Sequence, residues 1–447
     1  MGMAEKVFIG VDVGGTKISA GLVTQSGRIR ARKKCATPRA GQKETLRAIA
    51  GVIEETLAKG KGAKPDGIGI GVPGIVDVEK GKVLITPNAD LSETDIVREL
   101  EKTFKVKVVL GNDVNLGVLG EKWLGIARET EDVVGFFPGT GVGGGVIIEG
   151  KLLTGAHGAG AELGHIVMSL DGPQCSCGNR GCLEAFVGRW AIERDLREAV
   201  QKGERTVLTE LTGGKLDSIK SRLLRDALRR KDPLVTRVMK RASEILGLAC
   251  VSVRHAFDPE LIVFGGGVIE ACGDFILPIV RKVCQADPFF AKIGKCEVVR
   301  SVLGDDATML GAVATVQSKL GIQLGKGSIY PVIELAKSGK MLVDGEVCQQ
   351  SVHIRADGRV KKWKKLADES AERVRKLGPE ELERLCKKRP EVLILGSAEK
   401  RGLQVSKEGE EFLEGEGIEL KVLDTQQAVQ FYNETPRRKA AAILVNP

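Results

Sequence analysis

Near the N-terminus, two apolar segments flank a short polar turn. Residues 7–13 are almost entirely apolar, residues 14–17 read Gly-Gly-Thr-Lys, and residues 18–23 are again mostly apolar. Two apolar runs joined by a short glycine-containing turn are typical of a β-hairpin. The pattern therefore predicts a hairpin at the start of an α/β domain.

The same hydrophobic periodicities predict the elements that follow. We expect strands at 66–72 and 106–110, and helices at 43–59 and 92–104, the latter capped by Ser92. A second α/β unit then follows, with strands at 132–137, 144–149 and 261–264 and helices at 184–201, 217–230 and 233–257. Residues 305–319 include the small residues of Ala-Thr-Met-Leu-Gly-Ala-Val-Ala, which predicts a helix of small residues.

Turn-forming residues between Gly321 and Gly327 mark a candidate linker at 321–330. After it the chain alternates short apolar runs with helical patterns. Strands are expected near 341–344, 351–354, 392–395 and 418–422, and helices at 366–376, 379–388, 406–416 and 425–434. This alternation predicts a further α/β domain over residues 331–447.

Composition narrows the class of protein. The 447 residues exceed one ordinary domain, and 42% hydrophobic residues with 57 glycines fit an α/β protein with many tight turns. With no long apolar run and a first strand at Val7, we expect a cytoplasmic protein with no membrane partner. The net charge is +9, but the largest basic cluster, Lys361 to Lys365, fits a solvated strand end. We therefore expect no nucleic-acid partner.

Three glycine-rich turns follow predicted strands. Glycine clusters also serve ordinary tight turns, so each alone is weak evidence. Together they suit tetrahedral phosphate oxygens, because their backbone N–H groups are not covered by side chains. Asp12 precedes the first turn, where a carboxylate can hold Mg²⁺ through water. The turns are Gly14-Gly15-Thr16, Gly139-Thr140-Gly141 and Gly265-Gly266-Gly267.

The spacing of these turns, with Lys17 after the first, resembles the phosphate and adenosine motifs of the ROK family of bacterial sugar kinases and repressors. The resemblance covers about residues 7–320. It implies two ribonuclease-H-like lobes of the actin, hexokinase and Hsp70 superfamily, which close on ATP and a sugar, with the third turn covering adenine and ribose. Pro138 departs from the pattern and removes one backbone donor.

On this resemblance the chain divides into two lobes and a tail. The N-terminal lobe is expected at 1–115 with a returning helix at 305–320. The C-terminal lobe is expected at 116–304 and includes a zinc loop at 162–184. The accessory α/β domain at 331–447 follows the linker.

Asn112 and Asp113 come directly after the predicted strand 106–110. Phosphoryl transfer needs a sugar hydroxyl oriented in line and a carboxylate that accepts its proton. By themselves the two residues also fit a common loop opening. The resemblance implies that Asp113 is the general base and that Asn112 binds the sugar.

Three cysteines, Cys175, Cys177 and Cys182, follow His165 within a short segment. Three thiolates and one imidazole complete the tetrahedral shell of a structural Zn²⁺ without water. A Cys175–Cys182 disulfide and free buried thiols are the alternatives, and a cytoplasmic chain argues against the disulfide. The resemblance further implies that this loop sets His165, Glu162 and Glu184 against the sugar.

The identity of the sugar is less well marked. Pro87-Asn88 matches a family dipeptide whose asparagine contacts the sugar, but residues 89–93 do not match the tryptophan-containing pattern of many hexose kinases. The leading hypothesis is a glucokinase-like enzyme that converts glucose to glucose 6-phosphate. Kinases of fructose, N-acetylmannosamine or another N-acetylhexosamine are alternatives, and the family implies a homodimer or homotetramer.

Two hypotheses compete with a kinase. One is a sugar-responsive transcriptional repressor, which is disfavoured because the phosphate turns are kept and the hairpin starts at residue 7 without a helix-turn-helix before it. The other is a non-catalytic sugar sensor. Residues 335–445 resemble a family of small α/β proteins that includes a mitochondrial complex I assembly factor, and they show no catalytic set. We interpret this domain as an interaction or regulatory module with a protein partner.

Overall fold

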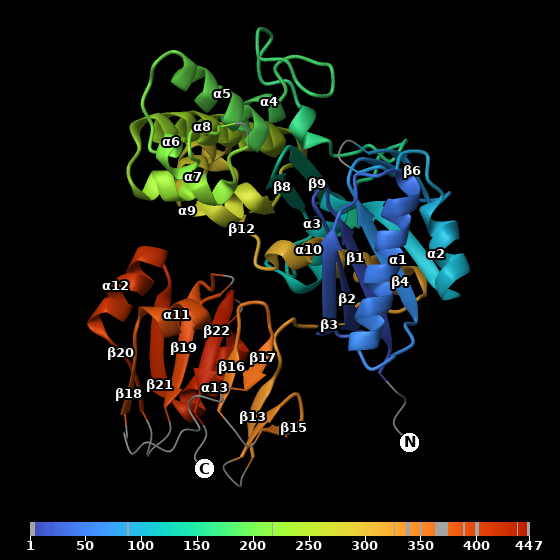
Figure 1. Cartoon of the computed structure of the whole chain (residues 1–447), viewed down its shortest axis with the longest axis vertical. Helices are drawn as coiled ribbons and strands as arrows, with labels where there is room; N and C mark the ends of the chain where they lie inside the picture. The colour runs from blue at the N-terminus through green and yellow to red at the C-terminus, as the bar shows by residue number, and fades with distance from the viewer. Residues whose placement is uncertain are drawn as a thin grey trace. The chain divides into compact units, whose positions relative to one another are not determined.

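A computed structural model of the chain describes residues 5–86, 89–216, 218–325, 327–336, 340–348, 351–362, 374–387, 389–397, 402–435 and 437–444. The chain forms two compact units. The first comprises Met1–Gln25 with Arg30–Lys326, and the second comprises Ser26–Ile29 with Gly327–Pro447. In Figure 1 most of the first unit runs from blue to yellow, and the second, apart from the short blue segment Ser26–Ile29, is orange to red.

The first unit contains two five-stranded sheets of the same layout. One has the order β3 (Ile29–Ala36), β2 (Lys17–Thr24), β1 (Val7–Val13), β4 (Gly67–Val72) and β7 (Lys107–Asn112). The other has the order β10 (Lys151–Leu152), β9 (Val142–Ile148), β8 (Val133–Pro138), β11 (Leu261–Phe264) and β12 (Glu297–Arg300).

Each sheet is built around an antiparallel hairpin extended by two parallel pairs. The hairpins are β1 with β2 and β8 with β9, and the parallel strands are β4 and β7 in one sheet and β11 and β12 in the other. The two hairpin turns, at 14–16 and 139–141, therefore occupy equivalent places in the two lobes. The strands predicted at 7–13 and 261–264 are confirmed as β1 and β11.

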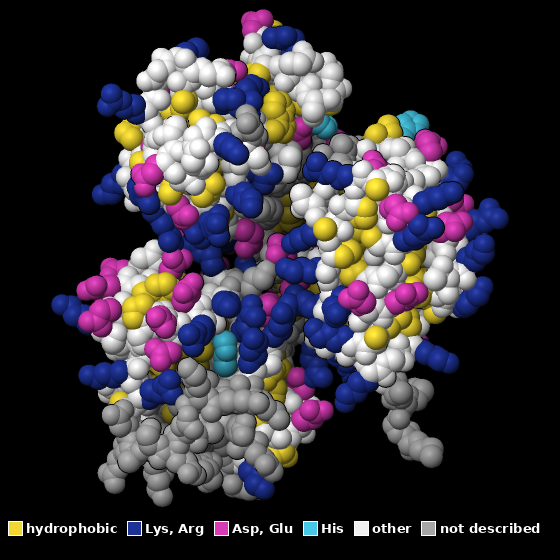
Figure 2. All heavy atoms as spheres, in the orientation of Figure 1, with side chains coloured by type: hydrophobic (Ala, Val, Ile, Leu, Met, Phe, Trp, Pro, Cys, Tyr) yellow, Lys and Arg dark blue, Asp and Glu magenta, His cyan; other side chains and the backbone are white. Residues whose placement is uncertain are grey.

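Helices cover the sheets. Those of the first lobe are α1 (Gln42–Lys59) and α2 (Ile96–Phe104), beside a small hairpin of β5 (Ile75–Asp77) and β6 (Lys82–Ile85). The second lobe carries α4 (Glu184–Val187), α5 (Arg189–Gln201), α6 (Leu208–Leu211), α7 (Ser221–Arg229), α8 (Pro233–Phe257) and α9 (Gly266–Gln285). On the face shown in Figure 2, basic and acidic side chains are interspersed over the region of α1 and α2.

Two further helices, α3 (Asp113–Leu124) and α10 (Ala307–Lys319), pack against each other with their backbones nearly in contact. A Cβ atom at Gly311 would lie 1.7 Å from the carbonyl oxygen of Leu116, and one at Gly120 would lie 2.2 Å from that of Ala307. The glycines permit this close approach because they have no side chain. The small-residue composition of 305–319 is thus explained by packing.

Glu121, on α3, fixes the segment that leads into α10. Its side chain is fully buried. Oε1 accepts hydrogen bonds from Leu303 N at 2.9 Å and Ser301 Oγ at 2.5 Å, and Oε2 accepts one from Ile126 N at 3.0 Å. Burial raises the pKa of Glu121, while these donors oppose the shift. The carboxylate ties α3 to the point where the chain returns from the second sheet.

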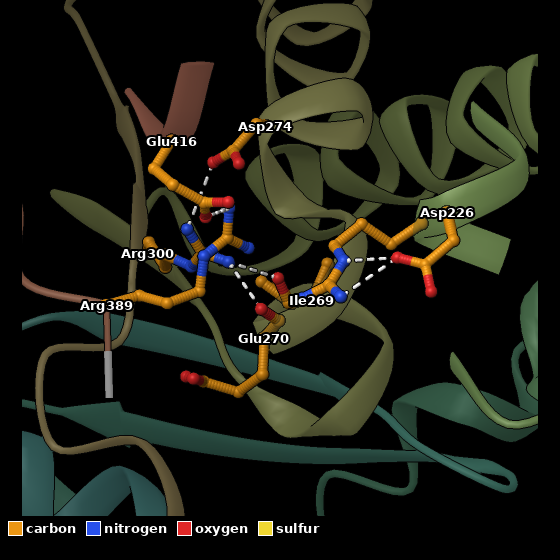
Figure 3. Close-up of polar contacts among 8 residues, drawn as sticks. Asp226, Ile269, Glu270, Asp274, Arg300, Arg389 and Glu416 are labelled. Atoms are coloured by element: carbon orange, nitrogen blue, oxygen red, sulfur yellow. Dashed lines mark hydrogen bonds and ion pairs between the residues drawn. The ribbon is translucent and has the colours of Figure 1, made fainter. Parts of the chain in front are cut away.

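Arg300, at the end of β12, holds the first turns of α9. Its Nη2 donates to Glu270 O at 3.0 Å and also to Ile269 O, and its Nη1 pairs with Asp274 Oδ1 at 3.1 Å (Figure 3). Carbonyl groups near the start of α9 are thereby anchored to the neighbouring strand. This contact fixes the position of the helix end that carries the third glycine turn.

Two helix predictions were wrong in detail. The predicted helix 184–201 is broken at Gly188, whose extended backbone separates α4 from α5. Helix α2 is capped by Asp95, which accepts from Arg98 N, whereas Ser92 Oγ accepts from Thr86 N at 3.0 Å. Sequence alone did not separate these residues, because aspartate and serine are both good N-caps.

The second unit is a separate α/β fold. Its main sheet has the order β17 (Val360–Lys362), β16 (Val352–Ile354), β22 (Lys439–Ile443), β19 (Val392–Ser397) and β21 (Glu419–Asp424). Smaller sheets are formed by β13 (Ile333–Leu335), β14 (Met341–Val343) and β15 (Glu346–Cys348), and by β18 (Val374–Leu377) with β20 (Gly402–Val405). The helices are α11 (Pro379–Leu385), α12 (Lys407–Glu416) and α13 (Thr425–Glu434).

Helix α13 confirms the prediction at 425–434. The helix predicted at 366–376 is wrong at its end, where residues 374–377 form β18, and its first part lies outside the described residues. Within the part of the chain that the structure describes, none of the helices combines the length and apolar composition needed to cross a membrane.

Candidate active site

The first glycine turn joins β1 to β2. Gly14 N donates to Lys17 O at 2.9 Å and closes the turn. Among the described residues, the N–H groups of Gly15 and Thr16 have no acceptor. Gly15 is partly buried and Thr16 is exposed, so both N–H groups are accessible from outside, and two adjacent donors of this kind at a strand end fit an anionic ligand.

The second glycine turn, which joins β8 to β9, also presents two adjacent N–H groups without an acceptor among the described residues. Gly139 N donates to Gly141 O at 2.8 Å, and the N–H groups of Thr140 and Gly141 have no acceptor within the described part of the chain. A Cβ atom at Gly141 would lie 2.2 Å from Glu184 Oε2, so no side chain fits there. The equivalent turns of the two lobes thus present matching pairs of donors.

The third turn forms the N-terminus of α9. Gly265 N donates to Phe136 O, and the helix begins at Gly266 without a side-chain cap. Gly266 has φ +81°, and a Cβ atom there would lie 2.6 Å from Pro138 O, so the position requires glycine. The first N–H groups of a helix lack intrahelical partners and favour negative charge.

Asn112 and Asp113 lie at the junction of β7 and α3. Asn112 Oδ1 caps α3 by accepting from Val114 N and Asn115 N, each at 2.9 Å, and its Nδ2 donates to Gly74 O at 3.0 Å. The structure thus gives Asn112 a local role that explains its place at this junction, and one Nδ2 hydrogen is left for a ligand. Asp113 is the first residue of α3, and Thr308 Oγ1 donates to its carbonyl oxygen at 3.0 Å.

Desolvation raises the pKa values of two carboxyl groups predicted to act at the site, Asp113 and Asp12. Desolvation raises the pKa of Asp113 to about 6, with a further rise from the charge of Glu162 and an opposing hydrogen bond from Val114 N. Desolvation also raises the pKa of Asp12 to about 7, aided by the charge of Asp113 and opposed by Lys17. Lys17 Nζ in turn lies 3.4 Å from Asp305 Oδ2. Asp12 and Asp113, predicted from separate motifs, are brought within electrostatic reach of each other.

The predicted zinc ligands come together. The ligand atoms of His165, Cys175, Cys177 and Cys182 all lie within 4.8 Å of one another. His165 Nδ1 is 3.7 Å from Cys175 Sγ, and the Sγ atoms of Cys177 and Cys182 are also 3.7 Å apart. Three sulfurs and one imidazole nitrogen at this spacing fit a tetrahedral metal ion such as Zn²⁺.

Glu184 links the cysteine loop to the second glycine turn. Its Oε2 accepts from Val142 N at 2.9 Å, and its Oε1 accepts from Ser176 Oγ at 2.9 Å. Glu162 precedes the short helix that carries His165, and desolvation raises its pKa, although His165 opposes the shift. Both carboxylates predicted for the sugar therefore flank the cysteine and histidine cluster. Asn88, the remaining predicted sugar contact, lies outside the described residues.

Sequence reasoning missed Arg189. It begins α5, and its Nη2 donates to Thr140 Oγ1 in the second glycine turn at 3.0 Å. The available signal was Gly188 inside the predicted helix 184–201, because glycine is unfavourable in a helix interior, and the break there places Arg189 at a helix start next to the turn. Only the fold reveals the contact, because Thr140 and Arg189 are distant in sequence.

Comparisons with known proteins agree with this geometry. A family model described as "ROK family" matches residues 8–319, and one described as "Protein of unknown function (DUF498/DUF598)" matches residues 333–445. A glucokinase of Thermotoga maritima is 39% identical over 322 residues, which cover 71% of this chain and 100% of the glucokinase. A xylose repressor of Caldicellulosiruptor bescii is 30% identical over 283 residues, 62% of this chain and 70% of the repressor.

Among solved structures, a ROK family glucokinase from Streptomyces griseus in complex with glucose and AMPPNP has a TM-score of 0.62 and 31% sequence identity. The match covers 69% of this chain and 98% of the glucokinase. The two-lobed fold is therefore of the actin and hexokinase type, with a separate C-terminal domain. Residues 8–319 carry the glycine turns and the cysteine and histidine cluster, and through them the chain belongs to the ROK family.

Proposed function

We propose that this chain is an ATP-dependent hexose kinase that transfers the γ-phosphoryl group of MgATP to a hydroxyl of glucose, giving glucose 6-phosphate. The observation that carries the proposal is that one unit holds two equivalent hairpin turns with N–H groups lacking acceptors among the described residues and an aspartate, Asp113, at a strand–helix junction, where desolvation raises its pKa toward a neutral working pH. A general base is most effective when its pKa is near that pH. The glucokinase relatives support sugar phosphorylation, and the choice of glucose rests on them.

In this proposal the residues have distinct tasks. The unpaired N–H groups of the first two glycine turns bind phosphate oxygens, and the third turn lies against the nucleoside. Asp113 accepts the proton of the attacking hydroxyl, while Glu162, Glu184 and His165 orient the sugar together with Asn88 and Asn112. Asp12 would hold the Mg²⁺ that accompanies ATP, which neutralises charge on the transferring phosphoryl group.

The cysteines and His165 would hold a structural Zn²⁺ that fixes the loop carrying these sugar contacts. We further propose the lobe division of the sequence analysis, with 1–115 and 305–320 in one lobe and 116–304 in the other. The domain at 331–447 is proposed as an interaction module. A homo-oligomer is part of the same proposal, as the family implies.

The experiment is the substitution Asp113→Asn. It removes the base but keeps the size of the side chain, so turnover should fall by about 10²–10⁴-fold. Coupled ADP release with glucose measures the turnover, with fructose, N-acetylmannosamine and N-acetylglucosamine as parallel substrates. Circular dichroism and about one zinc per chain show that the fold is kept. A variant that turns over like the native chain would remove Asp113 from the mechanism.

A second candidate function is a sugar-responsive regulator, favoured by the similarity to a xylose repressor. In that case the chain would bind sugar or DNA without forming ADP. Each of the two hairpin turns presents two adjacent N–H groups without an acceptor among the described residues, and these favour a phosphate-binding enzyme instead. Absence of ADP formation with every hexose, together with a gel shift at physiological salt, would support the regulator.

A further inference from the structure

The second glycine turn is held by the start of helix α5. Arg189 N donates to Gly139 O at 3.1 Å, and Trp190 N donates to Thr140 O at 3.3 Å. These bonds exist because the chain leaves the helical path at Gly188 before α5 begins. Two carbonyl groups of the turn are therefore directed at α5, which leaves the N–H groups of Thr140 and Gly141 for a ligand.

The guanidinium group of Arg189 is fixed on two sides. Its Nε donates to Glu193 Oε1 at 3.2 Å, and its Nη2 donates to Thr140 Oγ1 at 3.0 Å. Glu193 is itself buried and accepts a second bond from Ile219 N at 3.1 Å, so its carboxylate has little freedom. Within the described residues, Nη1 of Arg189 has no partner. The side chain is 28% exposed and thus open to a ligand.

The Thr140 hydroxyl group is a further donor at this turn. Because its oxygen accepts a hydrogen bond from Arg189, its own proton is available to an anionic acceptor. A hydroxyl donor, two backbone donors and a preoriented guanidinium then meet at one turn. This set suits the oxygens of a phosphate chain, and guanidinium groups bind phosphate through directed, charge-assisted bonds.

We propose that Arg189, acting with Thr140, is the phosphate-binding cation of the second lobe and contacts nucleotide phosphates beyond the α-phosphate. The inference rests on the proposed kinase function. Arg189 would supply a positive charge at the second turn, whose own residues, Gly139-Thr140-Gly141, carry none. In the first turn Lys17 pairs with Asp305, whereas among the described residues Arg189 pairs with Glu193, one turn further along its own helix.

The test compares nucleotide affinities by isothermal titration calorimetry. The native chain, Arg189→Gln, Arg189→Lys and Thr140→Val are titrated with MgADP and, separately, with adenosine. Loss of one charge-assisted bond should weaken MgADP binding by about 10- to 100-fold in Arg189→Gln. Arg189→Lys should recover part of the loss, and adenosine affinity should stay within about twofold of native in every variant.

The matched control is Arg225→Gln. Arg225 lies on α7, and its Nε and Nη2 donate to Asp226 Oδ1 at 3.0 and 2.9 Å. Asp226 is labelled in Figure 3. It should bind MgADP like the native chain. Thr140→Val keeps Arg189 and removes only the hydroxyl, so it tests the same contact if Arg189→Gln fails to fold.

The outcomes separate the two proposals. Unchanged MgADP affinity in folded Arg189→Gln overturns the inference while native phosphorylation stands. An equal loss for MgADP and adenosine also overturns it, because Arg189 would then only brace the turn. A native chain that binds no MgADP and forms no sugar phosphate overturns the proposed function itself.

Discussion

At the residue scale, Asp113 is an ordinary aspartate whose pKa is changed by its desolvated surroundings. An exposed aspartate has a pKa near 3.9, whereas desolvation at the start of α3 raises that of Asp113 to about 6. The shift leaves the ionised carboxylate in the majority at neutral pH, about one pH unit above its pKa. The rate of the proposed phosphorylation should therefore fall as the pH drops below about 6.

The first prediction is the pH profile of turnover. Because protonation blocks the base, kcat should be about tenfold lower at pH 5 than at pH 7, with a midpoint near pH 6. Initial rates at saturating MgATP and sugar measure it. Removing the like charge in Glu162→Gln should move the midpoint to lower pH, and a flat native profile from pH 5 to 7 would contradict the assignment.

The same shift has a consequence for stability. The folded pKa of Asp113 is raised above its unfolded value, so the folded state binds the proton more tightly. This group therefore stabilises the fold more at low pH, and its contribution declines as pH rises from about 4 to 6. If Asp113 is the base, as proposed, its contributions to turnover and to stability respond to pH in opposite directions.

The second prediction concerns Gly266, at the start of α9. Its φ of +81° and the 2.6 Å approach to Pro138 O make Gly266→Ala strained, at a cost of at least about 1–2 kcal/mol. Thermal unfolding should show the loss, and MgADP affinity should fall with it. Gly267→Ala is the control, because a Cβ atom there meets nothing within 4 Å. Equal effects of the two substitutions would show that backbone geometry is not the cause.

At the element scale, the crossing of α3 and α10 is the contact that defines the first unit. Both helices come from segments that lie between or after the two sheets, and both have glycine where they meet. Glu121 adds a buried acceptor for the chain that enters α10. A close backbone contact and a polar anchor thus act at the same junction, which also carries Asp113 at the start of α3.

The third prediction tests this crossing. In Gly311→Ala the new methyl group would lie 1.7 Å from Leu116 O, so the helices must separate, at a cost of about 1–3 kcal/mol or more. Urea unfolding measures the change in free energy. Gly51→Ala, on α1, has no atom within 4 Å of its added Cβ and should stabilise the protein by about 0.4–1 kcal/mol. Destabilisation by both variants alike would argue against a specific close contact.

At the scale of the whole molecule, the proposed catalytic residues all belong to the region matched by the ROK family, residues 8–319. The C-terminal domain has its own sheets and its own buried cores. We therefore expect the phosphorylation activity of the ROK region to persist without the C-terminal domain.

The fourth prediction is the effect of deleting residues 328–447. Turnover with glucose should remain within a few-fold of the full chain, whereas oligomeric state or capture of a protein partner should change. Coupled ADP release and size-exclusion chromatography with light scattering measure the two properties. If the truncated protein matches the full chain in activity, oligomeric state and pull-down partners, the C-terminal domain is not an interaction module.

Much of the site could be predicted from residues that are close in sequence. The glycine turns, Asp113 and the proposed zinc ligands each lie in a short motif, and such motifs indicate local chemistry. The cluster of His165 with Cys175, Cys177 and Cys182 came together as the spacing implied. The long apolar strands were also found, because burial on both faces leaves a clear hydrophobic run.

Only the tertiary structure decided which of the glycine turns, helix starts and loops lie next to one another. The sequence by itself determined the glycine turns, the cluster of one histidine and three cysteines and the family, since each can be recognised from residues within a short segment or from their spacing. The fold decided that Arg189 reaches Thr140, that Asn112 caps α3 and that Asp113 has a raised pKa. These properties depend on contacts and burial between distant segments, and no local pattern of residues encodes them.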